Sequence, residues 1–304
     1  MHALIAKVIL PALCALTLPG PASANEDDLR YALKRGASTT LATDISAHES
    51  ALGRVMTGYG HVNLYGNGLF LSTKARPNMA RAWAVFHMTD YNGDTRGASR
   101  RILLGYDLPV MNRSRLGFVL GIGKADLDTG GEEIDSSTLS LGPHLKTRLG
   151  KYLRLRTWAT LSRPAYRFSG HRVRATRVGA GMRAGIDRTF ELVKLSGSAS
   201  FGYSHQRVPG TGRLRGFEIT RANTSLTTRA TFYPQNNWRP YLDFGLSRGM
   251  WRNDDGSDAY STPSMAAGLL WNYKKRSISV SVDGRQVFDP AMPLKLTTNY
   301  RLTF

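Results

Sequence analysis

The sequence predicts an all-β protein that forms a twelve-stranded antiparallel transmembrane β-barrel, with a short N-terminal helical segment in its lumen. Three observations predict this fold. The last segment alternates between apolar and polar residues, twelve strand-like segments follow one another at regular spacing, and their second face is rich in Gly, Ser, Thr and Arg. Side chains of a strand point to opposite faces in turn, so a period of two indicates one apolar and one polar face.

The last segment shows this alternation over eleven residues. One face carries Leu294, Leu296, Thr298, Tyr300, Leu302 and Phe304, and the other carries Lys295, Thr297, Asn299, Arg301 and Thr303. An apolar face can lie against lipid, as in a membrane barrel, or inside a water-soluble sandwich. This strand alone leaves both alternatives open.

The first 24 residues are typical of a secretory signal peptide. Lys7 gives a positive start, residues 8–18 are mostly apolar, and residues 22–24 form a small-x-small cleavage site. We therefore expect the mature chain to leave the cytoplasm. Cys14, the only cysteine, lies in this segment, so the mature chain would have neither thiol nor disulfide.

The chain is strongly basic. It has 41 Lys and Arg against 22 Asp and Glu, a formal charge of +19, and +18 remains without residues 1–24. Such an excess usually indicates an anionic partner. After the signal peptide, no stretch approaches the roughly 18 consecutive apolar residues of a membrane-spanning helix. Barrel strands need only about 9 to 11 residues to cross, so a membrane barrel remains compatible with these values.

Twelve strand-like segments cover the region 80–304, an even number, as bacterial barrels require. Their expected ranges are 80–90, 98–109, 114–126, 135–149, 151–168, 172–189, 191–206, 215–232, 238–252, 259–273, 276–288 and 293–304. The turns at 149–150 and 274–275 are tight, whereas 128–134 and 208–216 are longer and polar. Short turns on one side and longer loops on the other are typical of a membrane barrel.

The two faces of these segments decide between the alternatives. In the segment 114–126, one face carries Leu116, Phe118, Leu120 and Ile122, and the other carries Gly117, Val119, Gly121 and Gly123. Small and polar residues suit a crowded, hydrated lumen. A soluble periplasmic barrel also needs apolar residues inside, but a second face this rich in Gly and Ser is less typical of it. The membrane barrel is therefore favoured, and the soluble barrel is the alternative.

Residues 25–79 form a separate N-terminal segment. Residues 26–35 predict a short helix with Gly36 as its C-cap. A capping box opens a second predicted helix, 46–56. A further stretch, 65–74, is expected to be extended. We expect the second helix to plug the lumen.

The order of several motifs in the region 80–304 resembles the translocator (beta) domain of autotransporters. The matching stretches are 82–84, 104–109, 115–121, 139–142, 238–241 and the terminal Phe304. The resemblance implies a twelve-stranded barrel in a Gram-negative outer membrane, a helix threading the pore and export of an upstream passenger. It also implies insertion by the barrel assembly machinery, which reads the last strand, so the expected assembly signal is Tyr300, Leu302 and Phe304. The N-terminal segment is far shorter than a usual passenger and shows no solenoid repeat, so we expect no substantial passenger.

Strand parity places a set of basic side chains inside the barrel. They are Arg81, Arg101, Lys146, Arg148, Arg154, Arg156, Arg177, Arg183, Lys194, Arg221, Arg229, Arg285, Lys295 and Arg301, and the acids on the same faces are Asp107, Asp187, Asp243 and Asp283. At mid-depth in lipid each basic side chain would cost roughly 2 to 4 kcal/mol, which supports the inward assignment. The expected function is a membrane-embedded scaffold or a narrow pore that favours anions, which exports or holds the short N-terminal segment. Alternatively, these residues only line a hydrated wall and pair with the four Asp and with Asp44 and Glu49 of the N-terminal segment.

Basic residues near strand ends and in loops are expected to contact lipopolysaccharide phosphates, because guanidinium groups bind phosphate with two hydrogen bonds. They are Arg96, Arg100, Arg163, Arg172, Arg174, Arg213 and Arg215. Generic solubility is the alternative. Nucleic acid is not an expected partner, because export separates the chain from it and no recognition helix stands out. We expect a monomer.

An outer-membrane barrel enzyme, a protease or a lipid hydrolase, is a second functional hypothesis. Ser204 and His205 are adjacent, but neighbours in a strand point to opposite faces and cannot hydrogen-bond as nucleophile and base. His87 and His144 belong to no recognisable triad spacing. The sequence carries no metal, cofactor or phosphate-loop motif and predicts no catalytic residue.

Overall fold

The computed structural model describes residues 26–54, 61–73, 79–111, 113–212, 214–233, 237–273, 276–284 and 295–303. They form α1 (Glu26–Arg54), β1 (His61–Tyr65), β2 (Gly68–Ser72), β3 (Arg81–Asn92), β4 (Thr95–Met111), β5 (Ser114–Thr129), β6 (Glu132–Leu149), β7 (Leu153–Phe168), β8 (His171–Arg174), β9 (Thr176–Thr189), β10 (Val193–Val208), β11 (Phe217–Phe232), β12 (Trp238–Asn253), β13 (Gly256–Tyr273), β14 (Arg276–Asp283) and β15 (Lys295–Thr303). The expected signal peptide, Arg213, Arg285 and Phe304 lie outside the described residues, as does the side chain of Lys295.

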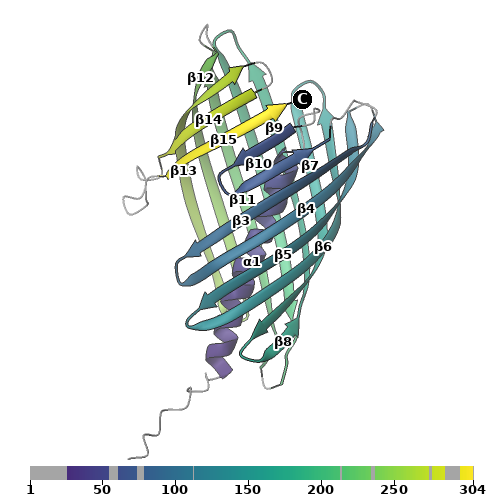
Figure 1. Cartoon of the computed structure of the whole chain (residues 1–304), viewed down its shortest axis with the longest axis vertical. Helices are drawn as coiled ribbons and strands as arrows, with labels where there is room; N and C mark the ends of the chain where they lie inside the picture. The colour runs from purple at the N-terminus through teal and green to yellow at the C-terminus, as the bar shows by residue number, and fades with distance from the viewer. Residues whose placement is uncertain are drawn as a thin grey trace, which may run out of the picture.

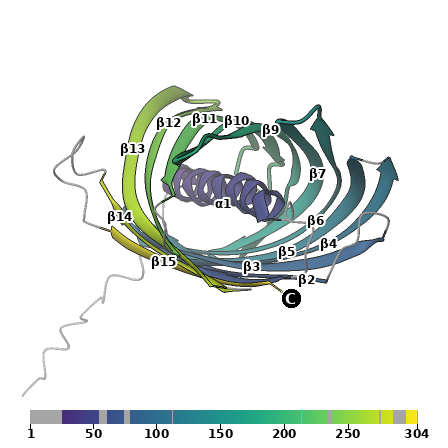
Figure 2. The same ribbon diagram turned by 90° about the horizontal axis from the view of Figure 1, so that it is seen from above.

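The strands close into one antiparallel barrel around α1 (Figures 1 and 2). Neighbouring strands follow the chain from β1 to β7 and from β9 to β15, β9 pairs with β7, and β15 pairs with β1. The short β8 pairs with the end of β7 and leads into β9 after Ala175. In the described part of the chain, the wall therefore has fourteen strands, with β8 as an addition to it.

The prediction of twelve strands is wrong by one hairpin. The structure adds β1 and β2, which lie between β15 and β3. Each has five residues, or about 17 Å of strand, too short for a period of two to stand out in the sequence. Leu64 and Leu71 are exposed on the outer face, whereas Phe70 is fully buried. The hairpin thus follows the same two-faced pattern as the longer strands.

The twelve expected segments all appear as strands, although 172–189 is divided into β8 and β9. The prediction of a long loop at 128–134 is wrong. β5 and β6 continue until only Gly130 and Gly131 remain between them, at φ values of 65° and 83°. A two-residue turn with both residues at positive φ matches the right-handed twist of paired strands. This end of the barrel therefore extends as strand rather than as loop.

The outer face of the wall is apolar, which confirms the orientation expected from the sequence. The exposed side chains of β5 include Leu116, Phe118, Leu120 and Ile122, whereas Val119 between them is 1% exposed. Exposed aromatic residues lie at strand ends, among them Phe190, Phe232, Trp238 and Tyr273. An outward apolar band bordered by aromatic rings is typical of a barrel wall in lipid.

α1 is one continuous helix of 29 residues inside the barrel (Figure 2). The predictions that a first helix ends at Gly36 and that a second begins at Ser46 are therefore wrong. A Cβ at Gly36 would lie 2.9 Å from Ile134 Cδ1, so this glycine brings the helix close to β6 instead of ending it. Residues 55–56 of the expected second helix lie outside the described residues. Among those described, no helix is both long and apolar enough to span a membrane.

Two apolar clusters join α1 to the inner wall. The first contains Leu29, Leu33, Ala37 and Leu41 of α1 with wall residues such as Ile134, Tyr166, Phe168, Phe217 and Ile219. The second contains Ile45, Ala47, Ala51 and Leu52 of α1 with Tyr65, Phe70, Trp83, Val85, Leu103, Val119 and Trp158. Around these clusters the lumen is a packed interior, and not the hydrated polar space that the Gly- and Ser-rich faces predict.

Gly142 marks a point where β6 approaches β7 too closely for a side chain. A Cβ there would lie 1.8 Å from the carbonyl oxygen of Ala159. Because backbone would have to move, Gly142→Ala should destabilise the barrel by about 1–3 kcal/mol. The measurement is the temperature at which the folded form, seen as anomalous mobility on gels of unheated samples, is lost. Gly93→Ala is the matched control, since a Cβ at Gly93 meets nothing within 4 Å, and equal stability of the two variants would contradict the prediction.

Candidate functional site: the helix-filled lumen

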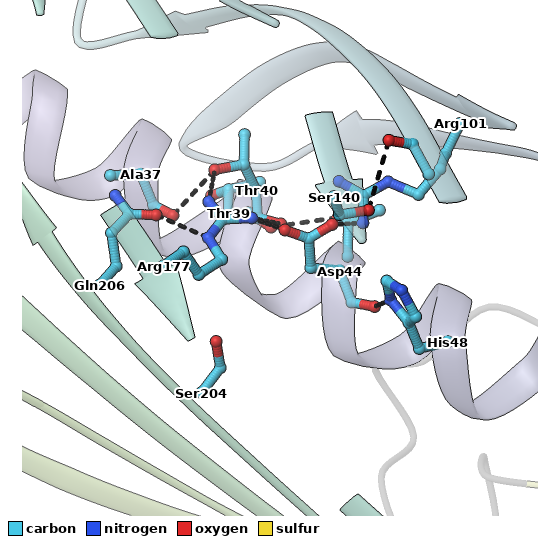
Figure 3. Close-up of polar contacts among 12 residues, drawn as sticks. Ala37, Thr39, Thr40, Asp44, His48, Arg101, Ser140, Arg177, Ser204 and Gln206 are labelled. Carbon is cyan, nitrogen blue, oxygen red and sulfur yellow. Dashed lines mark hydrogen bonds and ion pairs between the residues drawn. The ribbon is translucent and has the colours of Figure 1, made fainter. Parts of the chain in front are cut away.

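The middle of α1 carries a buried carboxylate between two buried guanidinium groups (Figure 3). Asp44 of α1 forms ion pairs with Arg101 of β4 and Arg177 of β9, and all three side chains are at most 6% exposed. Taking each ion out of water costs several kcal/mol, which only close pairing offsets. Asp44, Arg101 and Arg177 are referred to below as the Asp44 clamp.

Arg177 has further partners on both the wall and α1 (Figure 3). Its guanidinium donates hydrogen bonds to Gln206 Oε1 at 2.7 Å, Thr40 Oγ1 at 3.0 Å and Tyr166 Oη at 3.1 Å. Gln206 and Tyr166 are fully buried, and Gln206 Nε2 donates to Tyr166 Oη at 3.0 Å. Since these groups come from α1, β7 and β10, the clamp is fixed by elements far apart in the chain.

Histidines and tryptophans pack beside the second half of α1. The rings of His48 and Trp158 are stacked with centroids 5.3 Å apart. On the wall, Asp107 accepts a hydrogen bond from Trp83 Nε1 at 3.0 Å and lies 2.6 Å from His144 Nε2. All five side chains are at most 6% exposed, so these histidines belong to the packed interior.

Four basic side chains from neighbouring strands meet at the C-terminal end of α1. The register pairs Arg115 with Lys146, Lys146 with Arg156, and Arg156 with Arg183, across β5, β6, β7 and β9. These four residues are referred to as the basic ladder. A Cβ at Gly53 of α1 would lie 3.8 Å from Arg156 Nη1 and 3.9 Å from Arg183 Nη1. Like charges opposite each other repel, and the partial negative charge at the end of a helix offsets part of that repulsion.

A cavity of about 920 Å³ lies beside this end of α1. Its lining includes Ser50 and Gly53 of the helix, five arginines (Arg154, Arg156, Arg183, Arg229 and Arg301) and three aspartates (Asp187, Asp243 and Asp283). Arg154 is paired with Asp187, and Arg229 donates two hydrogen bonds of 2.6 Å to Asp243. Five guanidinium groups against three carboxylates leave the lining positive, and a positive lining favours anions.

The N-terminal half of α1 is tied to two turns of the barrel. The contacts are Arg30 Nη2 to Asp254 Oδ2 at 3.2 Å, Lys34 Nζ to Asp255 Oδ2 at 2.5 Å and Arg35 Nη2 to Asp94 Oδ2 at 2.8 Å. The hydrogen bond from Lys34 lowers the pKa of Asp255, and the bond to Asp94 raises the pKa of Arg35. The acid of each pair is at least 43% exposed, and ion pairs open to solvent contribute only about 0–1 kcal/mol each, so these contacts mainly position the helix end.

The basic residues predicted to face the lumen fall into groups. Arg81, Arg101 and Arg177 are buried, Lys146, Arg154, Arg156, Arg183, Lys194, Arg221 and Arg301 are partly buried, and Arg148 and Arg229 are exposed. Arg101 and Arg177 bind α1, whereas five others come together at the cavity. The idea that these residues line a conducting pore stays a prediction. The inward position of Arg285 and Lys295 also stays a prediction.

Sequence reasoning missed Arg115 of the basic ladder. It lies two residues before Gly117, on the face that parity assigns to the lumen, so the same rule would have found it. The expected assembly signal is only partly described: Tyr300 and Leu302 of β15 lie opposite Leu64 and Val62 of β1. Their role in assembly stays a prediction.

The residues considered for catalysis are separated. Ser204 Oγ donates to the carbonyl of Val178 at 3.0 Å, while His205 Nδ1 lies 3.0 Å from Thr220 Oγ1. The prediction that neighbouring Ser204 and His205 do not bond each other is confirmed. In the described part of the chain, no three His, Cys, Asp or Glu side chains are grouped so that they could hold a metal ion.

A protein-family model matches part of this chain. The family model described as autotransporter beta-domain matches residues 78–210. A search of curated proteins finds no match to this chain.

A comparison with solved structures finds partly similar chains at low sequence identity. The beta domain of the Bordetella autotransporter BrkA is 14% identical with a TM-score of 0.47, over 81% of this chain and 100% of that chain. The translocator domain of autotransporter NalP from Neisseria meningitidis is 11% identical with a TM-score of 0.48, over 90% of this chain and 97% of that chain. BauA, the ferric preacinetobactin receptor from Acinetobacter baumannii, is 12% identical with a TM-score of 0.42. The match covers 74% of this chain but only 46% of the length of BauA.

Asp44→Asn removes the charge of the clamp while keeping the size of the side chain. Arg101 and Arg177 would then remain buried without their counter-ion, and breaking a buried pair costs about 3–5 kcal/mol. We expect α1 to leave its seat more readily, measured as faster maleimide labelling of a cysteine placed at Ala47, which is 1% exposed. Ser46→Ala, on the exposed side of α1, is the control. Equally slow labelling in both variants would show that the clamp does not hold the helix.

The contact between Lys34 and Asp255 predicts a pH dependence at the N-terminal end of α1. Since the pKa of Asp255 is lowered from its ordinary value of 3.8, the stabilisation is complete above that value and is lost as the pH falls through the lowered one. Hydrogen-exchange protection of amides 29–36 should decrease in this acidic window, while amides 45–52 should keep theirs. Asp255→Asn should remove this step. A step of unchanged size in the variant would assign it to other groups.

Proposed function

We propose that this chain, an outer-membrane β-barrel of the autotransporter translocator type, acts as a plugged scaffold in that membrane. The barrel holds its own N-terminal helix in the lumen and leaves beside it a narrow passage that favours anions. The Asp44 clamp is the observation that carries this proposal.

The Asp44 clamp supports a helix that stays in the lumen, as opposed to one that passes through the barrel during export. If α1 slid along the barrel axis, Asp44 would leave two buried guanidinium groups unpaired, at a cost of about 3–5 kcal/mol. The two apolar clusters that join α1 to the wall would be lost at the same time. The ion pairs and the apolar clusters both stabilise α1 in its observed position, so the helix is a plug that the barrel retains.

The cavity at the C-terminal end of α1 supports a preference for anions. Its lining carries five arginines and three aspartates, and two of the arginines are neutralised by aspartate partners. Rings of Arg and Lys favour anions in a pore because the fixed charges attract them. The seated helix keeps the passage narrow, since its small residues Ser50 and Gly53 form one side of the cavity.

Export of the segment before the barrel is the second candidate function. The matched family is that of autotransporter beta-domains, and α1 runs through the barrel with its first turn at the end opposite to the end of β15 (Figure 1). A threaded N-terminal segment has this placement. An epitope tag before Glu26 that antibodies reach on intact cells would support export, and a tag protected on intact cells would exclude it.

Single-channel recording in planar bilayers tests the plug. The intact chain should conduct weakly, and deletion of residues 26–54 should raise the conductance several-fold because the helix no longer fills the lumen. Asp44→Leu should raise it in part or produce frequent openings. Ser46→Ala is the control. If deletion of the helix leaves the conductance unchanged, the plug proposal is wrong.

The reversal potential in a salt gradient tests the anion preference. In the chain without residues 26–54, Arg156→Ser combined with Arg183→Ser should shift the reversal potential toward cation preference, because two positive charges leave the cavity lining. Arg188→Ser, at an exposed position at the end of β9, is the control. An unchanged reversal potential in the double variant would show that these arginines do not set selectivity.

A further inference from the structure

The outer face of the β7–β8 hairpin carries four exposed arginines. They are Arg163, Arg167, Arg172 and Arg174, and they alternate with inward side chains such as Tyr166, Phe168 and Val173, which are at most 4% exposed. These four residues are referred to as the arginine hairpin. β8 lies at the same end of the barrel as the first turn of α1 (Figure 1).

Strand register concentrates these four charges. Arg167 lies directly opposite Arg172, and Arg174 lies opposite Ala165, the residue midway between Arg163 and Arg167. Opposite residues have Cβ atoms about 4.5–5.5 Å apart and diagonal neighbours about 7–8 Å. All four guanidinium groups are therefore within reach of one ligand.

The turn of this hairpin fixes the arrangement. Ser169 has φ 41° and Gly170 has φ 76°, and two consecutive residues at positive φ make the tight turn that holds paired strands in register. Ser169 Oγ also donates a hydrogen bond of 2.5 Å to Glu132 Oε2, at the start of β6. The arginine hairpin is therefore anchored to the neighbouring strand pair.

In the described part of the chain, the four arginines lack the acidic partners that Lys124 and Arg207 have on the outer face. Lys124 lies 3.5 Å from Asp126, and Arg207 lies 3.7 Å from Glu218. Within the described residues, no acidic oxygen lies within 4.0 Å of the arginine hairpin. Asp135 is opposite Arg167 on β6 and is the one acid in direct register. Like charges opposite each other destabilise a strand pair, so an external anion would stabilise this one.

The arginine hairpin borders the apolar band of the barrel. Directly next to it on the outer face lie Leu139, Leu161 and Val178, which are 56%, 52% and 45% exposed. A ligand at this place meets apolar side chains on one side and four guanidinium groups on the other. An anionic amphiphile has that chemistry, with acyl chains beside phosphate groups.

We propose that the arginine hairpin binds the phosphate groups of lipopolysaccharide in the outer leaflet. This glycolipid carries several phosphates on one molecule, whereas a phospholipid presents one phosphate in its headgroup. Each guanidinium can bind a phosphate through two hydrogen bonds, so four clustered arginines match a multiply phosphorylated headgroup. The end of the barrel that carries β8 and the first turn of α1 then faces the cell exterior.

Binding of purified lipopolysaccharide to the folded chain in neutral detergent tests the proposal. The variant replaces Arg163, Arg167, Arg172 and Arg174 by Ser. We expect its affinity to fall by about tenfold or more, because several charge-assisted hydrogen bonds are lost. Without lipid, the variant should be at least as heat-stable as the intact chain, since repulsion between like charges has been removed.

The matched control removes four arginines elsewhere. Arg113, Arg188, Arg239 and Arg276 lie in turns or at strand ends away from β8, and their replacement by Ser changes the net charge equally. The control variant should keep the affinity for lipopolysaccharide. Equal losses in both variants, equal binding of lipopolysaccharide stripped of phosphate, or equal binding of phosphatidylglycerol would each overturn the proposal. Anomalous gel mobility of unheated samples verifies that every variant is folded, and a double variant, Arg167→Ser with Arg172→Ser, replaces the fourfold one if that does not fold.

Discussion

The interior of this barrel depends on two ion pairs, which join Asp44 of α1 to Arg101 and Arg177 of the wall. Burying any of these three charged groups without a partner costs several kcal/mol. That cost is offset only when α1 lies in its position in the lumen and the groups pair. The same requirement aligns α1 along the axis, which brings its two apolar clusters onto the wall and its C-terminal end onto the basic ladder. Helix and barrel are therefore one packed unit rather than a wall with a loose insert.

Arginine side chains have three different surroundings in this chain, and these depend on their position in the barrel. Arg101 and Arg177 are buried counter-ions for the helix. Arg156 and Arg183 lie beside a cavity whose lining is positive, where we propose that a mobile anion is their counter-ion. Arg167 and Arg172 face outward at the edge of the apolar band, where we propose that lipid phosphates are their counter-ions. Net charge alone does not separate these cases.

Strand parity predicted much of the site, because a period of two assigns each side chain to one face whatever its partners are. It placed Arg101, Arg156 and Arg177 on the inner face, and it would have placed Arg115 there as well. It gave no means of choosing which arginine meets Asp44, since that depends on the height of α1 in the barrel. Parity also assigns Trp83 and Trp158 to the inner face, two residues after Arg81 and Arg156, but it does not show that these rings pack in an apolar cluster with α1.

The sequence by itself determined the strands, their two faces and the excess of basic residues inside, since these follow from local alternation and from the cost of charge in lipid. Only the tertiary structure decided the number of strands, because β1 and β2 are too short to show a period and gain their stability from pairing with β15 and β3. It also decided that α1 continues through Gly36, where close packing on Ile134 outweighs the local signal for a helix end. Contacts between residues distant in the chain settled both points, and local pattern carries no information about such contacts.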